Sequence, residues 1–119
     1  ALTKIFPTLK GKLGGCGMRV PVADGSLTDI TCVLKKSPDA KEINSAFKHA
    51  CENELKGIMQ YTEDPIVSAD IVTNPHSCIL DSQLTKVIGR TAKVVGWYDN
   101  EWGYSNRLVD LVKYVGRSL

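Results

Sequence analysis

Two long segments with helical periodicity bracket a run of short segments with strand periodicity, and this arrangement limits the folds open to the chain. The first helical segment is residues 37–55, SPDAKEINSAFKHACENEL. Ser37 is predicted to cap it and Pro38 suits its first turn. Its apolar residues form one stripe: Ile43, Ala46, Phe47, Ala50 and Cys51. A single face of this helix is therefore predicted to pack.

The second helical segment is predicted to begin at about Asn100. Asp99 or Asn100 is the expected N-cap, and Gly116 is expected to close the helix in the left-handed conformation. The apolar face consists of Tyr104, Leu108, Leu111 and Val115, widened by Trp102, Val109 and Val112. The end of the chain therefore has the pattern of an amphipathic helix.

A β-hairpin is predicted near the N-terminus. Residues 18–23, MRVPVA, form the first strand, Asp24-Gly25 the two-residue turn, and residues 26–34, SLTDITCVL, the return strand. On the return strand, Thr28, Ile30, Cys32 and Leu34 should face one way, and Leu27, Asp29, Thr31 and Val33 the other. Pro21 should lie at an edge or a bulge because it has no N–H to donate.

The remaining segments are short. Residues 1–9 read as the end of a helix. Strands are expected over 58–61, over a short extended piece after Asp64-Pro65, over 77–81, 85–88 and 93–98. The order ββαβββββα predicts an α+β fold, with a mixed, mostly antiparallel sheet that carries helices on one face.

Composition narrows the function classes. The 119 residues carry 15 basic and 13 acidic side chains, a net charge of +2, which favours neither nucleic acid nor an anionic membrane as a partner. No apolar run approaches the roughly 18 residues that span a bilayer, and no secretory signal is seen, so we expect a cytoplasmic protein. The four cysteines lack metal-site spacing, so we expect no metal and predict buried, reduced thiols.

The junction KVVGWYDNEWGYSNRLVDLV, residues 93–112, is unusually rich in polar and aromatic side chains for a strand-to-helix turn. One interpretation is that Asp99 and Asn100 cap the helix while the aromatic residues belong to the core. The other is that Asn100, with an amide acceptor and two donors, recognises another amide. The pattern alone leaves both open.

Arg19 has two interpretations of the same kind. A lone arginine in a strand is usually solvated or paired, but a guanidinium also matches phosphate oxygens bidentately. His76 is predicted to be a turn histidine, and His49 to lie beside the apolar stripe of its helix. No glycine fingerprint for dinucleotides and no phosphate-binding loop is found in the sequence.

Longer motifs carry a resemblance to a known family. The blocks LKGKL, MRVPV, SLTDITC, LKGIMQYTEDPIVSADI, NPHSCILD and WYDNEWGYSNRLVDLV follow in this order. Together they resemble glyceraldehyde-3-phosphate dehydrogenase of the bacterial or plastid type, over essentially all 119 residues. The resemblance implies that residues 1–119 are the C-terminal portion of the catalytic, substrate-binding domain. The family's N-terminal NAD-binding Rossmann domain and its nucleophilic cysteine motif are absent from this sequence.

The resemblance assigns roles to three residues. Arg19, in MRVP, matches the arginine that binds the substrate's phosphate. Asn100, in YDNEWGY, matches the asparagine that hydrogen-bonds the nicotinamide carboxamide, and Tyr104 matches a tyrosine near that ring. No catalytic residue and no metal ligand is assigned within the chain.

The family reaction oxidises the phosphorylated aldehyde to 1,3-bisphosphoglycerate with NAD or NADP and inorganic phosphate. In it a cysteine thiolate forms a covalent intermediate with the aldehyde. The resemblance implies a homotetramer, and we expect the 119-residue chain alone to bind no cofactor, to be inactive and to self-associate. The alternatives are the related erythrose-4-phosphate dehydrogenase and a stand-alone, non-catalytic interaction module. NAD and NADP are not distinguished by these residues.

Overall fold

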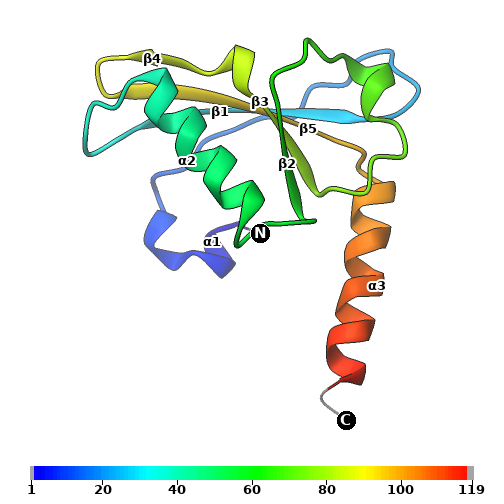
Figure 1. Cartoon of the computed structure of the whole chain (residues 1–119). Helices are drawn as coiled ribbons and strands as arrows, with labels where there is room; N and C mark the ends of the chain where they lie inside the picture. The colour runs from blue at the N-terminus through cyan, green and yellow to red at the C-terminus, as the bar shows by residue number, and fades with distance from the viewer. Residues whose placement is uncertain (1, 118–119) are drawn as a thin grey trace.

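The computed structural model describes residues 2–117 and consists of a small sheet, one helix on its face and a long helix that leaves its end (Figure 1). The helices are α1 (Leu2–Ile5), α2 (Ala40–Glu52) and α3 (Trp102–Gly116), with short 3-10 turns η1 (Pro7–Leu9), η2 (Ser68–Ile71) and η3 (Ser82–Leu84). The strands are β1 (Ser26–Val33), β2 (Met59–Thr62), β3 (Cys78–Asp81), β4 (Lys86–Ile88) and β5 (Thr91–Tyr98).

The sheet has the order β1-β5-β3-β2, with β4 also paired to β5. β2 and β3 are parallel, whereas β5 is antiparallel to β1, β3 and β4. The apolar core beside this sheet is small and consists of Ile71, Ile79, Leu80, Ala92 and Val95. The prediction of an α+β fold with a mixed, mostly antiparallel sheet is confirmed.

The predicted hairpin is wrong. Residues 18–23 form no strand, and β1 pairs along its whole length with β5 instead. Gly25 has a φ of +89°, and the Asp24 carboxylate accepts a 2.7 Å hydrogen bond from its N–H, so this pair bends the chain into β1. Pro21 has no N–H to donate to a ladder, which disfavours the predicted first strand. The predicted alternation of β1 still holds, since Thr28 and Ile30 line the side next to α2.

α2 begins two residues later than predicted. Its N-cap is Asp39, whose carboxylate accepts from the Glu42 N–H at 2.8 Å, while the Glu42 carboxylate accepts from the Asp39 N–H at 2.8 Å. This reciprocal capping box satisfies two backbone N–H groups at once. Ser37 is therefore not the cap, because an aspartate with a glutamate three residues on makes the better pair.

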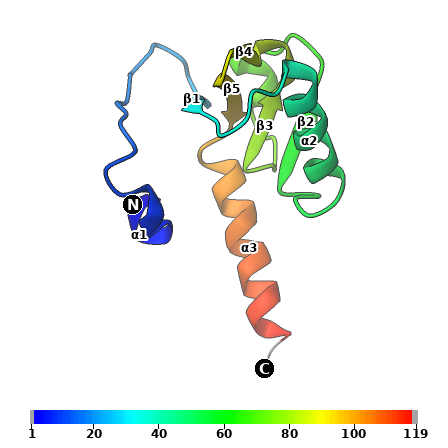
Figure 2. The same cartoon turned by 90° about the vertical axis from the view of Figure 1, so that its left-hand side faces the viewer.

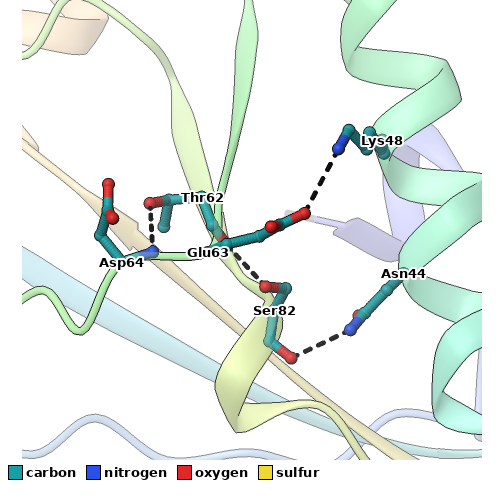
Figure 3. Close-up of polar contacts among 6 residues, drawn as sticks. All are labelled: Asn44, Lys48, Thr62, Glu63, Asp64 and Ser82. Atoms are coloured by element: carbon teal, nitrogen blue, oxygen red, sulfur yellow. Dashed lines mark hydrogen bonds and ion pairs between the residues drawn. The ribbon is translucent and has the colours of Figure 1, made fainter.

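Polar contacts seat α2 beside β2 and η3 (Figure 3). Asn44 donates its Nδ2 to the Ser82 carbonyl at 3.0 Å, and the buried Ser82 hydroxyl donates to the Thr62 carbonyl at 2.7 Å. Lys48 and Glu63 form an ion pair at 3.3 Å, but both side chains are exposed, so the pair adds little stability. The apolar stripe of α2 faces the sheet, and Phe47 lines a cavity of about 250 Å³ there.

The predicted strands of the middle segment are confirmed with two changes. β2, β3, β4 and β5 lie within one or two residues of the expected ranges. The extended piece expected after Asp64-Pro65 is instead the 3-10 turn η2, whose Ile71 is fully buried. The helix end expected at residues 1–9 is split between α1 and η1 by Pro7, and Figure 2 shows this N-terminal part apart from the sheet.

The four thiols are free, as predicted, but they are not uniformly buried. Cys16 is exposed, and Cys32, Cys51 and Cys78 are partly buried. Burial raises the pKa of both the Cys51 and Cys78 thiols, which makes them poor nucleophiles at neutral pH. Within residues 2–117, no helix has both the length and the apolarity needed to cross a membrane.

α3 leaves the end of β5 and projects away from the sheet (Figures 1 and 2). Within the described chain only Gly103 of this helix is buried, and Leu108, Leu111 and Val112 are 45 %, 56 % and 72 % exposed. The predicted apolar face is thus present but uncovered. Gly116 does not adopt the left-handed conformation; Arg117 follows it with φ −82° and ψ −13°, so the helix ends in a right-handed turn.

Candidate functional site

The candidate site lies where β1 begins and β5 ends. Ser26, the first residue of β1, is paired with Tyr98, the last residue of β5. Asn100 follows Tyr98 by two residues, so the antiparallel pairing brings it next to Ser26. The Ser26 hydroxyl donates a hydrogen bond to Asn100 Oδ1 at 3.1 Å. Two side chains 74 residues apart in the sequence therefore meet at this edge of the sheet.

Asp99 fixes the bend between β5 and α3. The residue is 3 % exposed, and its Oδ1 accepts from the N–H groups of Trp102 at 2.7 Å and Glu101 at 3.1 Å. Its Oδ2 accepts from the Thr73 N–H at 2.8 Å. The Trp102 hydrogen bond, supported by those of Thr73 and Glu101, lowers the pKa of Asp99 despite the opposing effect of burial. An ionised Asp99 therefore ties the start of α3 to the loop after η2.

This arrangement separates the two interpretations of Asn100. The N-cap residue of α3 is Glu101, whose side chain makes no cap hydrogen bond, so the prediction of Asp99 or Asn100 as the N-cap is wrong. The N–H groups of Glu101 and Trp102 instead donate to the Asp99 carboxylate, which lies just before the N-cap. Asn100 is exposed, and its Oδ1 contacts Ser26 rather than the backbone of the helix. The Asn100 amide is thus held by one side-chain contact at the surface, and it makes no hydrogen bond to the N–H groups at the start of α3.

Two residues next to this junction have unusual backbone conformations. Thr73 has a φ of +63°, which is rare for a β-branched residue and costs about 1–3 kcal/mol. The added Cβ of any larger residue at Gly25 would lie 2.8 Å from Ile71 Cδ1, and φ there is +89°. The left-handed conformation of Thr73 directs its N–H to Asp99. The strained residue therefore contributes a hydrogen bond that holds the bend.

A second contact holds the start of α3 against the loop before β3. A Cβ at Gly103 would lie only 2.7 Å from the His76 carbonyl oxygen, so the helix can approach this loop only with glycine there. His76 is in this bend, as predicted, and its Nδ1 lies 2.8 Å from Asn74 Oδ1. Burial, with a smaller effect of Arg107, lowers the pKa of His76, so the ring is neutral in the folded chain near pH 7.

The other two sequence-predicted site residues lie apart from this junction. Arg19 is exposed in the irregular segment between η1 and β1, not in the strand that was predicted. Tyr104 is 65 % exposed on α3, one turn after Asn100. Within residues 2–117, no hydrogen bond or ion pair joins Arg19 to Asn100 or to Tyr104. The structure therefore brings Asn100 and Tyr104 to one end of α3 and leaves Arg19 on a separate segment.

Sequence reasoning missed the residues that support Asn100. Ser26 was expected only as the first residue of a hairpin strand, and Thr73 was not singled out. Nothing in local spacing signals either role, because both depend on contacts with the end of β5. Among the described residues, no group of three or more His, Cys, Asp or Glu side chains could hold a metal ion. The polar side-chain groups at the junction of β5 and α3 are the Asn100 amide, the Ser26 hydroxyl and the Asp99 carboxylate.

Comparison with known proteins gives the family of the chain. The pattern of the family described as "Glyceraldehyde 3-phosphate dehydrogenase, C-terminal domain" matches residues 1–100. Glyceraldehyde-3-phosphate dehydrogenase of Mycobacterium avium is 62 % identical over 119 residues, which is 100 % of this chain and 35 % of that protein. The Mycobacterium leprae protein of the same name is 60 % identical over the same share of both chains.

A more distant bacterial relative gives the same result. Glyceraldehyde-3-phosphate dehydrogenase 2 of Streptomyces avermitilis is 54 % identical over 120 residues, which cover 100 % of this chain and 36 % of that protein. The chain spans about a third of the length of these relatives. The family pattern covers the motifs from LKGKL to NPHSCILD, and the relatives also cover WYDNEWGYSNRLVDLV. The chain therefore belongs to the glyceraldehyde 3-phosphate dehydrogenase C-terminal domain family.

Proposed function

We propose that residues 1–119 are the C-terminal portion of the catalytic domain of a phosphorylating glyceraldehyde-3-phosphate dehydrogenase. The whole enzyme would oxidise the phosphorylated aldehyde to 1,3-bisphosphoglycerate with NAD or NADP and inorganic phosphate. In that enzyme this segment positions the nicotinamide and the substrate phosphate, while the nucleophilic cysteine and the Rossmann domain come from elsewhere. The observation that carries the proposal is the Asn100 amide, which is exposed beside Ser26 and is not used by the helix cap.

The chemistry of Asn100 fits a nicotinamide. A carboxamide has one acceptor oxygen and one donor NH2, and the asparagine side chain offers the same pair of groups. Asn100 stands at the junction of a strand and a helix, whose backbones are rigid, so its amide can hold the ring in one place. The bound cofactor supplies the hydride acceptor. Tyr104 is exposed one turn along α3 and would pack near the same ring.

Arg19 is proposed to bind the phosphate of the substrate. Its guanidinium is exposed on the segment that leads into β1, seven residues before Ser26. An extended chain spans at most about 3.6 Å per residue, so Arg19 lies within about 25 Å of Ser26 along the backbone. This segment therefore supplies binding and orientation, and the bond-breaking groups are supplied by the rest of the enzyme.

Asn100→Ala in a full-length dehydrogenase that carries this chain as its C-terminal third should weaken NAD binding about three- to tenfold. It should also slow single-turnover hydride transfer, because the ring loses a hydrogen bond that orients it. The KM for the phosphorylated aldehyde should not change. Calorimetric NAD titration and stopped-flow absorbance measure these effects.

The matched control is Asn106→Ala. Asn106 lies on α3, and its Nδ2 donates to the Trp102 carbonyl at 2.9 Å, so this variant loses an asparagine hydrogen bond away from the proposed ring site. Asn106→Ala should leave NAD affinity unchanged. Wild-type NAD affinity and hydride-transfer rate in Asn100→Ala would refute the proposed function.

Assembly is the second part of the proposal: the full enzyme is a homotetramer, and the 119-residue chain alone self-associates. The support is the uncovered apolar face of α3, where Leu108, Leu111 and Val112 are about half to three-quarters exposed. Such contiguous apolar surfaces are typical of interaction sites. Sedimentation of the isolated chain at high concentration should show dimers or larger species. A clean monomer at all concentrations would contradict this.

A further inference from the structure

We infer that Ser26 is a positioning residue that fixes the orientation of the Asn100 amide, so that Asn100 meets the nicotinamide carboxamide as a donor through Nδ2. The observation is the hydrogen bond from Ser26 Oγ to Asn100 Oδ1, at 3.1 Å. The inference rests on the proposed function, because it specifies how Asn100 would act on that ligand. It adds a residue and a direction of hydrogen bonding to the site.

An asparagine at a binding site has to be oriented. The torsion that rotates its amide is soft and roughly two-fold, so an unrestrained amide presents its donor and its acceptor about equally. The Ser26 hydroxyl can donate or accept; in the structure it donates to Oδ1 and so holds the amide in the orientation observed. Since the oxygen and the nitrogen lie on opposite sides of the same planar group, engagement of Oδ1 by Ser26 turns the Nδ2 donors of Asn100 away from β1.

Ser26 is held by the sheet, and Asn100 is held by a bend that hydrogen bonds fix. Ser26 is locked by its pairing with Tyr98, and the preceding Gly25 packs against Ile71. On the other side, the bend that carries Asn100 is held by the three hydrogen bonds that Asp99 accepts. A supporting residue on a rigid element restricts a binding side chain more tightly than one on a loop.

The orientation has a chemical consequence for the ring. The carboxamide lies on one edge of the nicotinamide, so a donor that reaches its oxygen selects one of the two ring orientations about the glycosidic bond. A flipped Asn100 amide would present an oxygen to that oxygen, which is repulsive. Ser26 therefore influences, through Asn100, which face of the nicotinamide ring receives the hydride, and it does not have to contact the cofactor.

The test uses a full-length dehydrogenase that carries this chain, with Ser26→Ala, Ser26→Thr and Ser26→Val. Threonine and valine have the same shape and suit a strand, so they differ only in the hydroxyl. NAD affinity of the resting enzyme is measured by calorimetry. Ser26→Ala and Ser26→Val should bind NAD about two- to fivefold more weakly, and Ser26→Thr should bind it as the wild type does. Equal affinities for the threonine and valine variants would overturn the inference.

A double-mutant cycle separates this inference from the proposed function. If Ser26 acts through Asn100, Ser26→Ala should have no further effect in an Asn100→Ala background. A full additional loss there would mean that Ser26 acts in another way, and the inference fails. If Asn100→Ala weakens NAD binding but Ser26→Ala does not, the inference fails and the proposed function stands. If Asn100→Ala itself has no effect, the proposed function fails and the inference fails with it.

The direction of the hydrogen bond is tested with 3-acetylpyridine adenine dinucleotide, which keeps the carbonyl oxygen of the ring substituent and lacks its NH2 group. If Asn100 donates to that oxygen, Ser26→Ala and Asn100→Ala should weaken binding of this analogue by the same factors as binding of NAD. In addition, deuteride transfer by Ser26→Ala should lose part of its face selectivity. An analogue whose binding is insensitive to Asn100→Ala would overturn the donor assignment.

Discussion

Arg19→Ala in a full-length dehydrogenase that carries this chain should raise the KM for the phosphorylated aldehyde about ten- to a hundredfold. A hydrogen bond between a guanidinium and a phosphate is worth about 1.5–3 kcal/mol, and about 1.4 kcal/mol corresponds to a factor of ten. Arg19 is exposed on an irregular segment and makes no structural ion pair within residues 2–117. Its removal should therefore change binding and leave the fold intact. Steady-state kinetics at saturating NAD measures the effect.

Two comparisons make this result specific. The kcat/KM for unphosphorylated glyceraldehyde should be the same in the wild type and in Arg19→Ala, because that substrate lacks the phosphate. Lys12→Ala removes another exposed cation from the same region and should leave the KM unchanged. A wild-type KM in Arg19→Ala, or an equal rise in Lys12→Ala, would argue against a phosphate contact at this residue.

Asp99→Ala should have the largest effect on stability, lowering the free energy of unfolding of this part of the enzyme by about 2–4 kcal/mol. The variant leaves the N–H groups of Trp102, Glu101 and Thr73 without their acceptor at a site that is 3 % exposed. It also removes what holds Thr73 in its left-handed conformation. Hydrogen–deuterium exchange over residues 72–74 and 99–104 should show the loss locally, alongside thermal unfolding.

The same carboxylate predicts a pH dependence. The folded state lowers the pKa of Asp99 below its ordinary value of 3.8, mainly through the Trp102 hydrogen bond. Its contribution is therefore complete above that value and is lost as the pH falls through the lower, folded pKa. His76 acts at higher pH: the folded state lowers its pKa below 6.5, so the unfolded state takes up its proton first and stability falls as the pH drops below 6.5.

Asp99→Asn and Asp110→Ala are the comparisons for this prediction. Asp99→Asn should remove the acid-side loss that belongs to Asp99 and leave the loss from His76. Asp110 lies on α3 in an exposed ion pair with Arg107 at 2.8 Å, so Asp110→Ala should cost less than about 1 kcal/mol. If Asp99→Ala proves as mild as Asp110→Ala, Asp99 does not hold the bend.

The local patterns of the sequence predicted most elements because each reflects packing on one face. The stripe from Ile43 to Cys51 predicted α2, and the alternation of β1 correctly separated Thr28 and Ile30 from Leu27 and Asp29. The hairpin was predicted wrongly because the local sequence pattern of a strand does not show which other strand it pairs with. Asp24-Gly25 reads as a hairpin turn, but a two-residue turn signal does not show whether the residues before it pair with those after it.

The candidate site shows the same division. Asn100 was predicted from the residues around it, and the resemblance to the family implied a specific role for it. Its supports were not found, because Ser26 reaches Asn100, and Thr73 reaches the neighbouring Asp99, only in the folded chain. Arg19 was placed on a strand, and the structure has it on an exposed irregular segment, where the ladder expected from the hairpin does not form.

The sequence by itself determined most of the stretches that are helix or strand, which of their faces are apolar, and that the chain has the motifs of this dehydrogenase family. Those properties follow from periodicity and residue type over a few neighbours. The tertiary structure decided that β1 pairs with β5, that the Asp99 carboxylate rather than Asn100 accepts from the N–H groups at the start of α3, and that Ser26 contacts Asn100 from 74 residues away. Strand alternation gives the face of a strand but not its neighbour, so contacts set by long-range pairing appear only once the sheet is formed.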